Sequence, residues 1–264
     1  MAAVNLPDAR RLKSYLFRIP LATRLIILLI TVFYIATVFV PWLRQWGALV
    51  PHEISLSTLY RLNTFPLLHR DFVHFLSNIL VLVPLLDRFE QEHGTMVTLA
   101  LFTGQFGLLP GGLYTLLERH VFRLDSSAIG ASVWVFLLLS YEAVRTSKTH
   151  PHLVIMNYKI PTWITPLAPL LLISFLIPHS SFLGHSCGAV VGYVWGLGYI
   201  RFLAPPDKVL RWLEARLNLL GRLPRYVSVD QKTYGRYGVL PTSSNGRPGT
   251  ANGSKPGQRL GLDV

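Results

Sequence analysis

The chain has 264 residues, of which 51% are hydrophobic and 14% are charged, and its formal net charge is +12. A soluble domain carries about 25% charged residues, and several apolar runs here approach the roughly 20 residues that cross a bilayer. The composition therefore excludes an ordinary soluble domain and indicates an all-α polytopic membrane protein.

The basic residues lie mainly before the first apolar run and after the last one. Those that decide this are Arg10, Arg11, Lys13, Arg18 and Arg24, then Arg201, Lys208, Arg211, Arg216, Arg222 and Arg225. This placement follows the positive-inside rule for a chain with both termini in the cytosol. No groove-reading motif accompanies the charge, so it does not indicate nucleic-acid binding. The first apolar run starts late and is long enough to span, so no cleavable signal peptide is expected.

Six apolar runs are predicted to cross the membrane, and an even number returns the chain to its starting side. They cover residues 21–43, 71–87, 95–116, 128–144, 161–178 and 182–203. The loop after the fourth run carries Arg145, Lys148 and Lys159, which again indicates the cytosol. We expect a cytosolic segment over residues 1–19 and one membrane domain over residues 20–204.

Two further segments follow the membrane domain. Residues 205–225 repeat apolar side chains at helical spacing with basic residues opposite, which predicts an amphipathic helix on the cytosolic membrane surface. Residues 226–264 are rich in Gly, Ser, Pro and Asn, and we expect a disordered tail.

Two stretches place polar side chains among small residues inside apolar runs. "SSAIGASVWVF" holds Ser132, and "GHSCGAVVG" holds His185. Small residues let transmembrane helices approach closely, so packing alone explains either stretch, and Gly184, Gly188 and Gly192 form such a stripe. A buried histidine nevertheless needs a partner, and a serine hydroxyl becomes a nucleophile when a base takes its proton. We therefore expect His185 to act on Ser132.

A third stretch, "HRDFVHFLSN", contains His69, His74 and Asn78. His74 and Asn78 are four residues apart and share a helix face. They could bridge neighbouring helices. A metal site is less favoured, because His69 and His74 do not align on one face. An oxyanion hole is the sharper interpretation, because a tetrahedral intermediate needs preorganised donors about 3 Å away.

Together these residues resemble the rhomboid family of intramembrane serine proteases, and the resemblance covers about residues 20–204. The family's second-span pattern of His, His and Asn is matched by His69, His74 and Asn78. It implies a six-transmembrane-helix rhomboid fold, His74 and Asn78 as oxyanion donors, and His69 as a structural residue. It implies no metal and no cofactor.

The loop before this span also resembles the family. "LYRLNTFPLLH" is similar to its Trp-Arg motif, with Tyr60 replacing the tryptophan and Arg61 retained. Glu90 falls at the position of a family glutamate that is expected to tie this loop down.

The nucleophile and base motifs complete the resemblance. "GASV" places Gly130 before the nucleophile Ser132, and "HSCGAVVG" assigns His185 as the general base with Gly188 and Gly192 on its helix. Many members have glycine after the serine, where this chain has Val133, which could alter helix packing. The relaxed motif is similar to that of the fungal Golgi-type branch, so the resemblance implies a Golgi membrane, with the endoplasmic reticulum as alternative.

The tail contains "KPGQRLG", which resembles a segment that binds the AAA ATPase of the valosin-containing protein family. The residues concerned are Gly257, Arg259, Leu260 and Gly261. The expected activity is cleavage of transmembrane segments, possible substrates being membrane-tethered transcription-factor precursors. The alternatives are a non-catalytic adaptor that recruits the ATPase and, less favoured, a transporter with a histidine-lined path.

Overall fold

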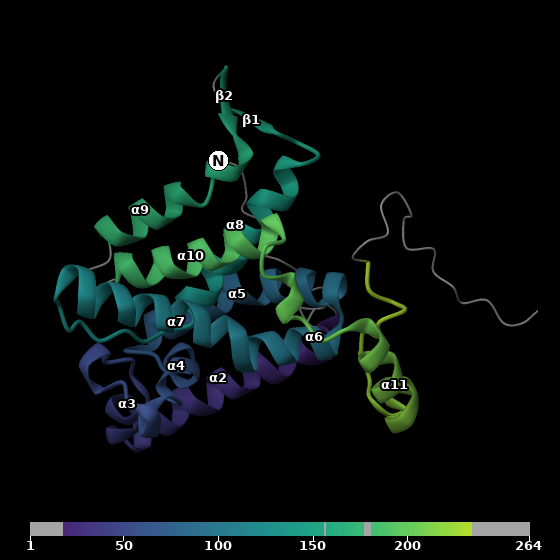
Figure 1. The fold of residues 1–264 in the computed structure, drawn as a ribbon, viewed down its shortest axis with the longest axis horizontal. Coiled ribbons are helices and arrows are strands. Elements are labelled where there is room, and N and C mark those ends of the chain that lie inside the picture. The colour runs from purple at the N-terminus through teal and green to yellow at the C-terminus, as the bar shows by residue number, and fades with distance from the viewer. Residues whose placement is uncertain (1–17, 156, 177–180, 234–264) are drawn as a thin grey trace, which may run out of the picture. The chain divides into compact units, whose positions relative to one another are not determined.

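A computed structural model describes residues 18–155, 157–176 and 181–233 of the chain. These residues form helices joined by short loops, with one two-stranded antiparallel sheet (Figure 1). The helices are α2 (Leu21–Phe39), α3 (Trp42–Gly47), α4 (Arg61–Thr64), α5 (Phe72–His93), α6 (Thr95–Ala100), α7 (Phe106–Leu116), α8 (Ser132–Ser147), α9 (Leu167–Leu176), α10 (Phe182–Leu197), α11 (Asp207–Leu217) and α12 (Leu219–Arg222). π-Helical turns at Leu101–Gln105 and Leu117–Phe122 continue α6 and α7. Short 3₁₀ turns occupy Pro51–Glu53, Leu56–Thr58, Phe65–Leu67, Thr162–Ile164 and Arg201–Leu203.

Several of these helices are suited to a membrane. Leu21–Phe39, Phe72–His93 and Thr95–Phe122 are long and apolar enough to cross one, and the bent pair formed by α10 and Arg201–Leu217 would count as a fourth span if it acts as one. Helices α8 and α10 have 16 residues each, or about 24 Å against a hydrocarbon core of about 30 Å. Helix length alone therefore does not establish the predicted count of six.

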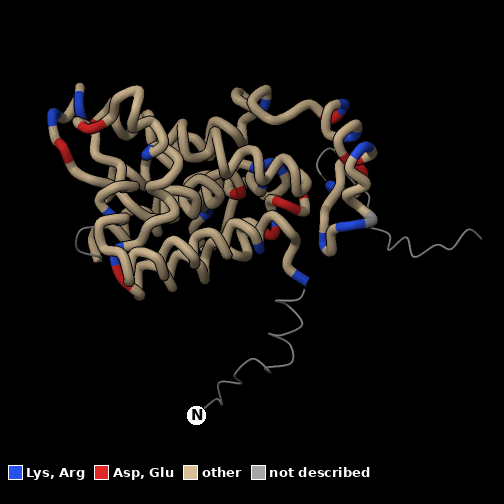
Figure 2. The backbone as a smooth tube through the Cα atoms, turned by 90° about the horizontal axis from the view of Figure 1, so that it is seen from below, with Lys and Arg blue, Asp and Glu red and all other residues tan. Residues whose placement is uncertain are grey.

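Charge is distributed as a membrane protein requires. Figure 2 shows Lys, Arg, Asp and Glu mostly at helix ends and in connecting loops. Helix α2 carries no charged residue after Arg24, and its outward side chains are apolar, for example Leu28, Val32 and Val38, each more than half exposed. An outward apolar face of this kind suits contact with lipid.

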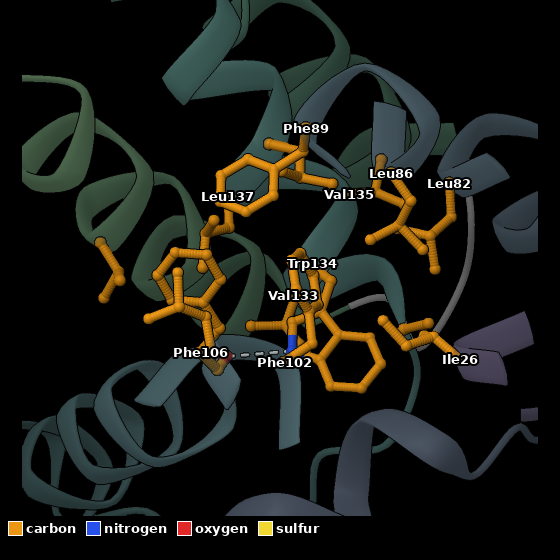
Figure 3. Packing of buried hydrophobic residues seen from close by; sticks show 14 of the residues in the cluster. Ile26, Leu82, Leu86, Phe89, Phe102, Phe106, Val133, Trp134, Val135 and Leu137 are labelled. Carbon is orange, nitrogen blue, oxygen red and sulfur yellow. Dashed lines mark hydrogen bonds between the residues drawn. The ribbon is translucent and has the colours of Figure 1, made fainter. Parts of the chain in front are cut away.

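Helix α8 lies at the centre of the core. Its first half, "SVWVFLLL", is apolar on every side, which is the pattern of a helix surrounded by others. Figure 3 shows Val133, Trp134, Val135 and Leu137 packed among Phe89, Leu86 and Leu82 of α5 and the ring of Phe106. The indole N–H of Trp134 donates to the Phe106 carbonyl at 3.0 Å, which satisfies the buried polar group.

Helix α10 packs against α8 through the glycines that were expected to let it approach a neighbour, Gly188 and Gly192. A methyl group on Gly188 would collide with the Val133 carbonyl, and one on Gly192 with the Leu137 carbonyl. Gly196 continues the stripe against Val144, whereas a methyl group on Gly184 would meet only Ser181. Of the three glycines in the predicted stripe, Gly184 at the start of α10 therefore takes no part in this contact, and Gly196 extends it.

Glu90 does not tie down the loop around Arg61, so that prediction is wrong. Its carboxylate accepts the backbone N–H groups of Ala22 and Thr23 at 2.8 and 2.7 Å, together with the Thr23 and Thr95 hydroxyls at 2.8 and 2.6 Å. The first N–H groups of a helix have no partner inside it, and Pro20 provides no side-chain cap for α2. Glu90 therefore caps α2 from a neighbouring helix.

Changing Glu90 to glutamine should lower stability measurably. An amide keeps one oxygen but turns an N–H₂ group toward donors, so we expect the free energy of unfolding to fall by about 1–2 kcal/mol. Denaturant titration in detergent micelles measures this. The matched change Glu53→Gln, at a carboxylate whose side chain is 55% exposed, should cost less. Equal losses at the two sites would contradict the capping role.

The packed part of the protein extends further toward the C-terminus than expected. Residues 226–229 were predicted to belong to the disordered tail, yet all four are buried. Val227 exchanges two hydrogen bonds with Thr95, and Glu214 accepts from the Tyr226 hydroxyl and the Val229 N–H at 2.9 Å each. The sequence "YVSV" supplies apolar side chains that composition averaged over the whole tail conceals. The tail residues Gly257, Arg259, Leu260 and Gly261 lie outside the described residues, as does the segment before Arg18.

The predicted loop after the fourth run contains the sheet. Strands β1 (His152–Ile155) and β2 (Tyr158–Pro161) pair from His152 with Pro161 to Ile155 with Tyr158. A hairpin was not predicted here, because neither strand alternates strictly between apolar and polar residues.

Candidate active site

Ser132 and His185 meet where α8 and α10 begin. Ser132 is the first residue of α8, and His185 lies in the first turn of α10. The His185 Nε2 atom is 2.9 Å from the Ser132 Oγ atom, although the residues are 53 positions apart. The expected contact therefore exists, and its geometry allows the imidazole to receive the hydroxyl proton.

The imidazole of His185 packs against a tilted aromatic ring. Its ring centroid lies 4.6 Å from that of Phe136, with an interplanar angle of 31°. Phe136 is one helical turn after Ser132 and therefore projects on the same side of α8. Within the described part of the chain, the His185 Nδ1 atom has no hydrogen-bond partner. Phe136 was not predicted as a site residue. Its position four residues after Ser132 could have indicated it, because residues four apart share a helix face.

The segment before Ser132 is tied to the loop that precedes α5. Ala128 forms an isolated antiparallel bridge with Leu49, and the Gly130 N–H donates to the Phe65 carbonyl at 2.9 Å. The Ala131 N–H donates to the His69 Nε2 atom at 3.3 Å. Burial, and to a lesser degree His74, lowers the pKa of His69 to about 3. The ring is thus neutral near pH 7, as an accepting nitrogen requires.

Helix α5 presents both predicted oxyanion donors. Asp71 caps the helix by accepting the His74 N–H at 2.9 Å, and this bond, followed by that from Arg70, lowers the pKa of Asp71. The Asn78 amide donates one hydrogen to the His74 carbonyl at 2.9 Å, and an amide nitrogen carries two. The described residues contain no group of three or more His, Cys, Asp or Glu that could hold a metal.

Gly130 lets His74 approach the Ser132 hydroxyl. Its φ of +122° is rarely adopted by other residues. A Cβ atom here would lie 2.7 Å from the His74 Cε1 and Nε2 atoms and 3.5 Å from the Ser132 Oγ atom. The imidazole and the hydroxyl therefore flank one small space, which only glycine leaves open. Ser132 also offers its own backbone N–H, since first-turn N–H groups lack helical partners.

The loop around Arg61 is anchored within itself. Arg61 donates to the Ala48 carbonyl at 3.0 Å and pairs with Glu53 at 2.7 Å. Tyr60 stacks on Trp46 with ring centroids 4.7 Å apart. The carboxylate partner is therefore Glu53, eight residues upstream, and not Glu90.

Val133 is accommodated in the core between α8 and α10. It is buried, and its Cγ2 atom would lie 3.1 Å from a Cβ atom on Gly188. The side chain therefore occupies the space that a side chain on Gly188 would need. The residue after the nucleophile thus contributes to helix packing without displacing Ser132 from His185.

Comparison with known proteins identifies the family. The Rhomboid domain matches residues 56–202. Rhomboid-type serine protease 2 of Neurospora crassa is 50% identical over 275 residues, covering 99% of this chain and all of the relative. The protein of that name from Gibberella zeae is 53% identical over 243 residues, covering 92% and 90%. Rhomboid-type serine protease B of Aspergillus fumigatus is 51% identical over 235 residues, covering 89% and 86%. The chain therefore belongs to the rhomboid family and is a multi-pass intramembrane serine protease.

Proposed function

We propose that the protein cleaves transmembrane segments of membrane proteins with a Ser132–His185 dyad. The observation that carries the proposal is the 2.9 Å contact between the His185 Nε2 and Ser132 Oγ atoms. A serine hydroxyl is a weak nucleophile until an adjacent base takes its proton. A neutral imidazole is a suitable base near pH 7.

Each atom of the site then has a role. His185 takes the Ser132 proton as the oxygen attacks the peptide carbonyl carbon. The oxyanion is held by the His74 imidazole, the Asn78 amide and the Ser132 backbone N–H. His185 returns the proton to the leaving amine as the C–N bond breaks, which leaves an acyl-enzyme that water hydrolyses by the same proton route.

The reaction is assigned to a dyad because His185 is oriented without a carboxylate. Within the described part of the chain its Nδ1 atom has no hydrogen-bond partner, and Phe136 stacks on the ring instead. In a triad the third residue fixes the orientation and tautomer of the imidazole. Here aromatic packing supplies the orientation.

The topology that accompanies this function has six spans with both termini in the cytosol. The shorter crossings are α8, α9 with the preceding 3₁₀ turn, and α10. The basic residues at both ends of the membrane domain support this orientation. On α11, Val209 and Trp212 stay exposed beside Lys208 and Arg211, which supports a helix lying on the membrane surface.

Location and partners rest on the family branch. Resemblance to fungal Golgi-type rhomboids supports a Golgi membrane and single-span membrane proteins as substrates. Binding of an AAA ATPase through the tail stays a prediction, because those residues lie outside the described part. An adaptor of that kind would need no contact between Ser132 and His185.

Labelling by a serine-directed fluorophosphonate probe tests the dyad. Wild-type protein in detergent micelles should be labelled, and Ser132→Ala and His185→Ala should not be. Ser186→Ala removes an exposed hydroxyl beside His185, one that bonds only within its own helix, and should label normally. Unlabelled wild-type protein with a cooperative unfolding transition would overturn the proposal, as would labelling that survives in Ser132→Ala.

A further inference from the structure

A buried tyrosine on α7 reaches the nucleophile loop, residues 123–131. Tyr114 lies on α7 and is 1% exposed. Its hydroxyl donates to the Ser126 carbonyl at 2.7 Å. Ser126 is six residues before Ser132, so this bond fixes the start of the short segment that leads into α8.

A buried carboxyl group lies against the same hydroxyl. Glu118, one turn further along the helix, is 4% exposed, and its Oε1 atom is 3.1 Å from the Tyr114 oxygen. Its Oε2 atom has no hydrogen-bond partner among the described residues. A phenol has one proton, which the Ser126 carbonyl and the Glu118 Oε1 atom share as acceptors, the contact to Ser126 being the shorter. Burying two such groups inside a membrane helix is costly, and phenylalanine and leucine would fill the same space without that cost.

The loop has further ties on both sides. Its first residues are held by the Glu118 carbonyl, which accepts the Leu124 N–H at 2.9 Å, and by His52, which pairs with Asp125 at 2.6 Å. Leu49, Phe65 and His69 hold Ala128, Gly130 and Ala131, and all three belong to the chain before α5. Tyr114 holds the segment from α7. The Tyr114 bond ties Ser126, which lies between the contacts at Leu124 and Asp125 and those at Ala128 to Ala131. Removing it would let the chain around Ser126 shift between these fixed points.

We propose that Tyr114, backed by Glu118, is a positioning residue for the Ser132 hydroxyl. It does not touch the reacting atoms. It sets the path of residues 126–131, and so the placement of the Ser132 oxygen relative to His185. The inference rests on the proposed function, because the position of the Ser132 hydroxyl affects the reaction only if Ser132 is the nucleophile. A hydroxyl misplaced by a fraction of an ångström reacts more slowly without any change in how the protein folds.

The test separates placement from folding by the kinetics of fluorophosphonate labelling. Full-length protein in micelles is labelled over a range of probe concentrations. The labelled fraction at completion reports folded protein, and the saturating rate constant reports placement. In Tyr114→Phe we expect that rate constant to fall about tenfold, with the final labelled fraction and the half-saturating probe concentration near wild-type values.

Two variants serve as controls. Tyr226→Phe removes another buried hydroxyl that bonds a glutamate, Glu214, at 2.9 Å, but it lies far along the chain from the nucleophile loop and should keep the wild-type rate constant. Glu118→Gln keeps a side chain that can hydrogen-bond the Tyr114 hydroxyl, so we expect a rate constant close to wild type. Glu118→Leu should slow labelling, but less than Tyr114→Phe, and it carries the test if Tyr114→Phe does not fold.

The outcomes are distinguishable. A wild-type rate constant in both Tyr114→Phe and Glu118→Leu overturns the positioning role, as does a loss confined to the labelled fraction. Equal slowing in Tyr226→Phe overturns it too, since the effect would then be general. Labelling that persists in Ser132→Ala would instead overturn the proposed function itself.

Discussion

Ser132→Ala, His185→Ala and the double variant are each expected to lose cleavage to the same residual level. The loss should be of order 10⁴-fold or more in kcat, as found when members of a catalytic unit are removed. The reason is that the 2.9 Å contact couples the two residues, so that neither is expected to act without the other. Without His185 the hydroxyl keeps its proton, and without Ser132 the base has nothing to activate.

The measurement is cleavage of a single-span reporter in proteoliposomes, with Ser186→Ala as the matched control. Losses that multiply in the double variant would mean that the two residues act independently. Retained cleavage in either single variant would show that another group supplies the nucleophile or the base. Unfolding curves of all the variants confirm that each protein remains folded.

The pairing of Ser132 with His185 could be predicted from the sequence, because polar residues are rare in segments that cross a bilayer. Ser132 and His185 each stand in an apolar run, where a polar group is expensive and needs a reason. Gly188 and Gly192 were also readable, because spacing by four places them on one face. The cost of burial indicated that Ser132 and His185 need partners, and local periodicity indicated the shared face of the glycines; the roles of the two polar residues came from the resemblance.

The contacts that support the site and the fold could not be predicted from the sequence, because they depend on which helices lie next to one another. Glu90 caps a helix 67 positions earlier in the chain, and no local pattern specifies that partner. The packing of residues 226–229 depends on Thr95 and Glu214 in the same way. Phe136 was closer to prediction, since its spacing from Ser132 is local, but the histidine it stacks on comes from another helix.

Gly192→Ala is expected to be the most destabilising small change in the membrane domain. The added methyl group would meet the carbonyl group of Leu137 and its Cα atom. These are backbone atoms of α8 at Leu137, a fully buried residue, and they cannot rotate away. Helix α10 must then move away from α8, which also loosens the contacts at Gly188 and Gly196. We expect a loss of about 3 kcal/mol in the free energy of unfolding, at the upper end for overpacked cores.

Gly112→Ala on α7 is the matched control, because a methyl group there has no neighbour within 4 Å. It should be neutral or stabilising by about 0.5–1 kcal/mol, since glycine is unfavourable inside a helix. Denaturant titration in micelles compares the two variants, and equal stability would contradict the close contact of Gly192 with α8.

The movement of α10 away from α8 in Gly192→Ala must also lengthen the distance from His185 to Ser132, which lie at one end of this interface. Folded Gly192→Ala protein should therefore cleave more slowly as well, and normal activity together with reduced stability would show that the dyad does not depend on the separation of α8 and α10.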